Sequence, residues 1–218
     1  MTLLRVDASI QGPASASSAL ADLVFAEFTA ARPEEPVVIR HLGDHPVPAQ
    51  AWALAVAGAF TPEADRTPDQ IEALTLASSV ATELADAHAA LLALPLYNFG
   101  VSQHVKAWID LAIAGAPPGE RLLRDKPVVL VTTRGGAYGP GTPREGWDHS
   151  TSYLRRILAD VWGADLTVIE REFTLVGVNP ALDEFSEMAG QMKQAAEEAA
   201  AEAGRVLAHR YPVPADLR

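Results

Sequence analysis

The chain alternates short β-type segments with longer helical patterns, and this alternation constrains its fold more than any other feature. Two of the segments, residues 91–94 and 128–131, are wholly apolar and of strand length. Apolar runs of this length, set between turns and helical patterns, indicate strands buried on both faces of a parallel sheet. The pattern as a whole predicts strands at residues 3–8, 36–40, 90–95, 127–132 and 165–171.

Helical periodicity fills the intervals between these strands. Thr67-Pro68 and the serines around residue 15 are helix-start signals, and Gly163 is an end signal. Helices are expected through Leu20 and Phe28 and near residues 52–60, 69–86, 101–114, 147–162 and 181–209. Strand alternating with helix predicts an α/β fold with a parallel sheet between two helical layers, as a single domain over residues 1–218.

Composition narrows the classes of function. The formal net charge is −11, which argues against nucleic-acid binding, because that depends on Lys and Arg neutralising phosphates. No apolar run reaches the roughly 18 residues of a membrane span. The chain has no cysteine, and its first residues lack the pattern of a secretory signal. We therefore expect a cytoplasmic protein that contacts neither nucleic acid nor membrane.

Three predicted strand ends carry loops suited to binding. Ser9 and the stretch Ser15-Ala16-Ser17 lie where the first helix begins, and helix N-termini with hydroxyl donors hold phosphate readily. Leu96-Tyr97-Asn98-Phe99 offers aromatic surfaces and a carboxamide, which suit a planar ring such as a flavin. Thr133-Arg134-Gly135-Gly136 allows close backbone approach and supplies a guanidinium.

Each loop also has a plain structural interpretation. The first can be an ordinary serine-capped helix, the second a turn with aromatics in the core, and the third a glycine-rich turn. The sequence contains neither GxGxxG nor GxxxxGK[ST], which disfavours dinucleotide-wrapping and P-loop sites. Taken together, the three loops fit a mononucleotide with its phosphate at the first loop and its ring between the other two.

On these motifs the chain resembles the FMN-dependent NADH-azoreductase family, also described as NADH:quinone oxidoreductases. The family has Met-Tyr-Asn-Phe where this chain has Leu96 to Phe99, and Ser-Arg-Gly-Gly where it has Thr133 to Gly136. The resemblance implies a flavodoxin-like fold with strand order 2-1-3-4-5. It implies that FMN phosphate binds at Ser9, Ser15, Ala16 and Ser17, and that the ring lies between the other two loops. It also implies a homodimer in which NADH or NADPH reduces the flavin and a small aromatic acceptor, a quinone or azo compound, is then reduced in a ping-pong cycle. The flavin carries this chemistry, so no residue is assigned as a catalytic acid or base.

The sequence departs from the family pattern at residues 115–123, where the family has a longer aromatic segment that helps shape the pocket. This departure predicts a wider or differently lined pocket, in which Trp147 or Tyr153 could replace the missing aromatics. It also motivates one alternative, a redox-neutral FMN enzyme of a biosynthetic pathway. A second alternative from another class is a non-catalytic flavodoxin-like binding or electron-carrying protein. His41 and His45 lie in a proline-containing loop without a third ligand nearby, so no metal site is assigned.

Overall fold

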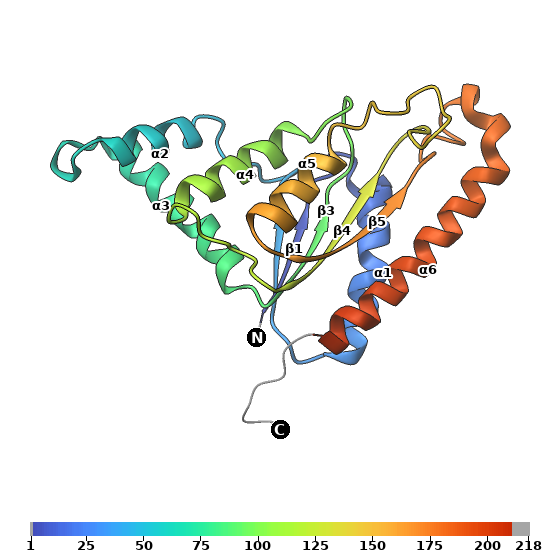
Figure 1. Ribbon diagram of the computed structural model, residues 1–218, viewed down its shortest axis with the longest axis horizontal. Helices are drawn as coiled ribbons and strands as arrows, with labels where there is room; N and C mark the ends of the chain where they lie inside the picture. Colours follow the sequence, from blue (N-terminus) through green and yellow to red (C-terminus); the bar gives the residue numbers. More distant parts are fainter. Residues whose placement is uncertain (1, 211–218) are drawn as a thin grey trace.

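The computed structural model describes residues 2–210 and contains one parallel sheet (Figure 1). Its five strands lie in the order β2-β1-β3-β4-β5, which confirms the predicted order and fold class. Their bounds are β1 Leu3–Asp7, β2 Val37–His41, β3 Ala89–Ala93, β4 Pro127–Thr133 and β5 Asp165–Arg171. Each strand lies within one or two residues of its predicted position.

Helices cover both faces of the sheet and give the fold its three layers. On one face, β1, β3 and β4 pack against α2 (Ala51–Phe60), α3 (Pro68–Asp86), α4 (Gln103–Gly115) and α5 (Thr151–Arg155). On the other, α1 (Ala16–Ala31) packs beside α6 (Ser186–Arg210). Figure 1 shows α2 and the start of α3 extending outward from the sheet, at the left of the view. No helix within residues 2–210 is both long and apolar enough to cross a bilayer.

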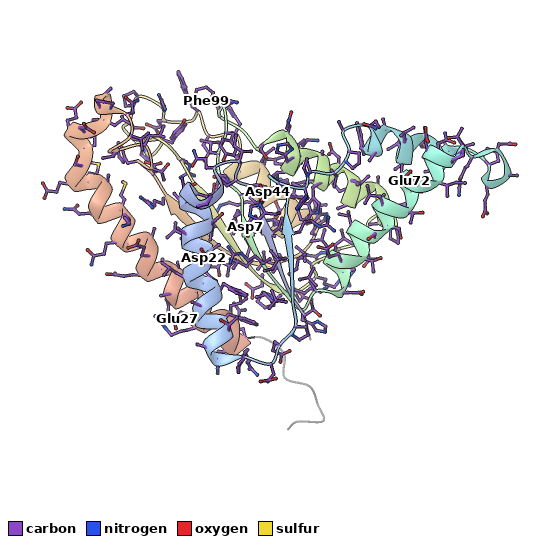
Figure 2. The ribbon with its side chains drawn as sticks, turned by 180° about the vertical axis from the view of Figure 1, so that it is seen from behind. Asp7, Asp22, Glu27, Asp44, Glu72 and Phe99 are labelled. Carbon is purple, nitrogen blue, oxygen red and sulfur yellow. The ribbon has the colours of Figure 1, made fainter. Side chains whose placement is uncertain are left out.

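Two buried charges in β1 are accommodated by pairing with each other. Arg5 Nε donates to Asp7 Oδ2 at 2.7 Å, and the Arg5 guanidinium also reaches Asp22 of α1 at 2.7 Å. The guanidinium carbon lies 5.4 Å from the centre of the Phe25 ring. Figure 2 shows Asp7 and Asp22 where α1 lies against the sheet. A buried strand tolerates these residues because each charge has an opposite partner within hydrogen-bond distance.

The helix predicted at residues 147–162 begins later and changes its winding. Asp148 Oδ1 accepts hydrogen bonds from the backbone N–H groups of Ser150 and Thr151, at 2.8 and 2.9 Å. This carboxylate accepts hydrogen bonds from the first free N–H groups of the helix, so α5 starts at Thr151. Residues 156–161 then form a π-helix, named η3 (Arg156–Val161). The final helix is likewise preceded by a separate 3₁₀ segment, η4 (Pro180–Phe185).

Main-chain pairing continues past β3 and β4 and places their two loops side by side. Leu94 N–H donates to the Val131 carbonyl at 2.9 Å, and Leu96 N–H donates to the Thr133 carbonyl at 3.0 Å. Across β1, Asp7 is in register with Ala93, so all three strands end at the same edge. The fold therefore brings the three predicted loops together at the carboxyl edge of the sheet.

Candidate functional site

A cavity of about 260 Å³ opens at this edge. Ten of the twelve predicted site residues line it: Ser9, Ser15, Ala16, Ser17, Leu96, Tyr97, Asn98, Phe99, Thr133 and Gly135. Arg134 and Gly136 do not. The cavity thus joins the loops that follow β1, β3 and β4, as expected for a ligand site at the switch point of a doubly wound sheet.

The first loop presents hydroxyl groups at the start of α1. Ser15 Oγ accepts from the Ser18 N–H at 3.1 Å and caps the helix, and it lies 3.1 Å from Ser17 Oγ. Both serine side chains are buried, yet both line the cavity. The free N–H groups of the first helical turn and the helix dipole add positive potential at this end. Hydroxyl donors and a helix N-terminus together suit a phosphate.

The second loop is tied to the first through Tyr97. Its hydroxyl lies 3.2 Å from Ser9 Oγ and accepts from the Ile10 N–H at 3.1 Å. Ser9 is packed closely from the other side, because a Cβ atom at Gly43 would lie 2.2 Å from the Ser9 carbonyl oxygen. Glycine at residue 43 therefore lets the chain after β2 pack directly beneath the first loop.

Asn98 and Phe99 hold a backbone conformation that non-glycine residues rarely adopt. Their φ angles are +47° and +69°, and the turn is closed by reciprocal hydrogen bonds between Tyr97 and Gly100 at 3.1 and 2.9 Å. Left-handed backbone at a binding loop costs about 1 kcal/mol per residue and persists only where the surrounding structure holds it. Figure 2 shows Phe99 at the outer edge of the molecule. The turn presents an aromatic ring and a carboxamide to the cavity.

In the third loop, Arg134 points away from the cavity lining and into a cluster of acids. Its Nε donates to Asp148 at 2.6 Å, and its Nη2 donates to Glu170 at 2.7 Å and to Thr151 Oγ1 at 2.9 Å. Glu172 lies 3.6 Å from Nη1. Burial lowers the pKa of Arg134, but hydrogen bonds and charge from Glu170 and Asp148 outweigh it and raise the pKa overall. Arg134 therefore joins β4, β5 and the loop before α5.

The structure adds five residues to the cavity lining that sequence reasoning missed: Gln11, Tyr138, Arg144, Thr174 and Leu175. Thr174 and Leu175 follow β5, and their N–H groups donate to the carbonyls of Arg134 and Gly135 at 3.1 and 3.2 Å. Leu175 lies over Gly135, where a Cβ atom would come within 2.6 Å of its Cδ1. These residues carry no periodic signal. Gly135 was the available hint in the sequence, because a glycine permits the close contact that Leu175 makes with it.

Aromatic side chains gather around Phe99 at the outer part of the site. The Phe99 ring meets Trp147 edge-on with ring centres 5.5 Å apart, and Tyr138 lies 6.5 Å away. Tyr153 instead packs against the core beneath α4, where burial raises its pKa. Residues 115–123 lie between α4 and β4, at the opposite edge of the sheet, where Leu123 N–H donates to the Trp162 carbonyl at 2.9 Å. Within one chain, Tyr97, Phe99 and Tyr138 are aromatic residues of the cavity lining, and Trp147 packs against Phe99.

The histidines considered for metal binding lie outside this cavity. His41 ends β2, and its Nδ1 lies 3.2 Å from a carboxylate oxygen of Asp44. No group of three or more His, Cys, Asp or Glu side chains arranged to hold a metal ion occurs within residues 2–210.

Comparison with known proteins defines the class. The model of a family described by its flavodoxin-like fold matches residues 1–205, so the chain belongs to that family. An FMN-dependent NADH:quinone oxidoreductase of Frankia alni is 38% identical over 202 residues, which cover 90% of this chain and 95% of the relative. A protein of the same name from Streptomyces avermitilis is 34% identical over 96% of this chain and 98% of its own.

Solved structures agree on the fold. An azoreductase from Bacillus anthracis superposes with a TM-score of 0.76 at 21% identity, covering 94% of this chain and 99% of that one. A second structure from that organism, an FMN-dependent NADH-azoreductase in complex with FMN, gives a TM-score of 0.70 at 17% identity over 93% and 99%. At these identities the likeness establishes the flavodoxin-like fold of the chain.

Proposed function

We infer that the protein is an FMN-dependent NADH:quinone oxidoreductase that reduces quinones or azo compounds by two electrons in a ping-pong cycle. The observation that carries this inference is the convergence of three loops on one cavity, whose lining combines buried hydroxyls with aromatic rings. Relatives that share 34 to 38% of their residues over nearly the whole chain bear this name.

The residues present fit FMN. Ser15 and Ser17 offer buried hydroxyls beside the N-terminus of α1, which suits a dianionic phosphate without requiring a lysine or arginine. The backbone at Gly135 and the side chains of Asn98 and Phe99 form the opposite part of the lining, where a flat ring is bounded by polar and aromatic groups. When bound, FMN supplies the acceptance and donation of the hydride equivalent.

The chain's own residues would bind the FMN and orient it. Ser9, Ser15 and Ser17 would hold the phosphate, and Leu96 to Phe99 together with Thr133 and Gly135 would hold the ring. Tyr97 keeps the first two loops in register through its hydrogen bonds to Ser9 and Ile10. Phe99 and Tyr138 would bound the space in which donor and acceptor alternate, and Trp147 supports Phe99 by edge-on contact.

Two alternative functions are not favoured. One is a redox-neutral pathway enzyme, which the shortened segment at residues 115–123 motivated, and the other is a non-catalytic carrier. That segment lies at the far edge of the sheet from the cavity, and the named relatives are oxidoreductases. Of the two possible electron donors, NADH and NADPH, we propose NADH, because it is the donor in the names of those relatives.

We further propose that the chain works as one domain, in the cytoplasm, as a homodimer. Trp52, Phe60 and Ile71 are exposed on the outward-extending α2–α3 arm and offer apolar surface to a second copy (Figure 1). Light scattering on the purified protein should give twice the 23.1 kDa chain mass. A mass of one chain at micromolar concentration would refute the dimer.

The test of function is NADH consumption with menadione as acceptor. We expect steady turnover that requires both the protein and added FMN, with free FMN alone and flavin-free protein as the two controls. Turnover no faster than the free-FMN control would reject the oxidoreductase assignment.

A further inference from the structure

We propose that Arg144 is the anion-binding residue of this cavity, and that it pairs with an acidic group on a molecule that takes or gives electrons there. Two such groups share the required chemistry: a sulfonate or carboxylate on an aromatic acceptor, and the diphosphate of the nicotinamide donor. The proposal deepens the proposed function and rests on it.

Arg144 is an exposed side chain that lines the cavity and lies against an aromatic ring. Its guanidinium carbon is 5.6 Å from the centre of the Tyr138 ring, and its Nη1 lies 3.4 Å from the Tyr138 hydroxyl. A Cβ atom at Gly136 would lie 3.1 Å from the same Nη1, so the guanidinium lies over the glycine turn that follows β4. Stacking on an aromatic face orients the planar group while leaving its outer N–H donors free.

This guanidinium has no carboxylate partner within residues 2–210, although the protein is acidic. Two acids of the same region accept hydrogen bonds from the backbone: Glu145 from the Gly141 N–H at 2.7 Å, and Glu172 from the Tyr138 N–H at 3.1 Å. Arg5, Arg134 and Arg205, by contrast, each form ion pairs with carboxylates. Among the described residues that line the cavity, Arg144 carries the sole formal charge.

The location of Arg144 separates it from the flavin phosphate. The proposed phosphate site is the hydroxyl cluster of Ser15 and Ser17 at the start of α1, whereas Arg144 lies against Tyr138 in the loop after β4. An anion held by Arg144 therefore belongs to the second molecule in the cavity. Arginine suits this role because its fork of donors matches the paired oxygens of carboxylate, sulfonate or phosphate groups.

The experiment compares wild type with Arg144→Gln and Arg144→Lys, all loaded with FMN. The control variant Arg156→Gln removes an exposed arginine on η3 that pairs with Asp160, so it changes net charge equally without touching the cavity. Calorimetry measures the affinity for three redox-inert probes: 2-naphthalenesulfonate, the uncharged 2-naphthol, and ADP-ribose.

For Arg144→Gln we expect affinity for one anionic probe to fall by about 5- to 20-fold, as for a charge-assisted hydrogen bond at a partly exposed site. Affinity for 2-naphthol should stay within about twofold in every variant. Loss confined to 2-naphthalenesulfonate assigns Arg144 to acidic acceptors, and loss confined to ADP-ribose assigns it to the donor diphosphate. Arg144→Lys should retain part of the affinity, and Arg156→Gln all of it.

The proposal is overturned if neither anionic probe binds wild type, or if Arg144→Gln binds both within twofold of wild type. Its failure is distinct from failure of the proposed function. Absence of NADH oxidation by the FMN-loaded wild type would reject the oxidoreductase, whereas a wild-type enzyme that turns over but shows no Arg144 effect rejects only the anion site.

Discussion

Replacing Arg134 by glutamine should destabilise the protein by about 3 kcal/mol, near the lower end of the range for breaking a buried ion pair. The side chain of Arg134 is 7% exposed, and that of its closest partner, Asp148, is 13% exposed. Glutamine would leave the carboxylates of Asp148 and Glu172 without the guanidinium that they share. Glu170 is 38% exposed and regains water, so its share of the loss is small.

Urea unfolding measures this loss. With a slope of roughly 2–3 kcal/mol per molar urea, suited to a chain of this size, the midpoint should fall by about 1–1.5 M. Arg155→Gln is the matched control, because Arg155 pairs with the same Glu170 at 3.4 Å from an exposed position. It should cost less than about 1 kcal/mol. An Arg134→Gln midpoint close to that of Arg155→Gln would refute the claim that Arg134 joins β4, β5 and the loop before α5.

The remaining predictions concern Asp148 and Asn98. Burial raises the pKa of Asp148, but hydrogen bonds from Thr151, Ser150 and Arg134 outweigh it and set the pKa below its ordinary value of 3.8. A carboxyl whose pKa is depressed by folding stabilises the protein above its unfolded pKa, and this contribution disappears as pH falls through the folded value. The Tm difference between wild type and Asp148→Asn should therefore be largest near pH 6 and shrink below about pH 4; a constant difference from pH 6 to pH 3 would contradict the assignment. Asn98→Ala and Asn98→Gly should both weaken FMN affinity or slow flavin reduction, because both remove the carboxamide from the cavity, while glycine relieves the positive φ. If fluorescence titration and stopped-flow reduction leave both variants unchanged, Asn98 is not part of the site.

The sheet was predictable because its strands carry strong local signals. The apolar runs in β3 and β4 and the β-type residues of β5 occupy their predicted positions within two residues. The convergence of the three loops followed from the geometry of parallel strands, whose carboxyl ends share one edge. These features depend on periodicity and topology, both of which can be read from a single sequence.

The features that escaped prediction depend on contacts between distant residues. The ion pairs of Arg134 were not predicted, because Glu170 and Asp148 approach it only once β5 and the loop before α5 are folded. The late start of α5 has the same origin, because the Asp148 carboxylate takes the first helical N–H groups. Tyr138 and Arg144 lie in a glycine- and proline-rich loop without periodicity, so the sequence pattern did not indicate that they line the cavity.

The most direct test of the central claim is titration of flavin-free protein with FMN, followed by anaerobic addition of NADH to the loaded sample. The account predicts saturable binding of one FMN per chain and loss of the oxidised flavin absorbance when NADH is added. Binding without loss of absorbance would contradict the reductase function while keeping the flavin site. Absence of binding would contradict the site itself and leave the resemblance to the fold alone.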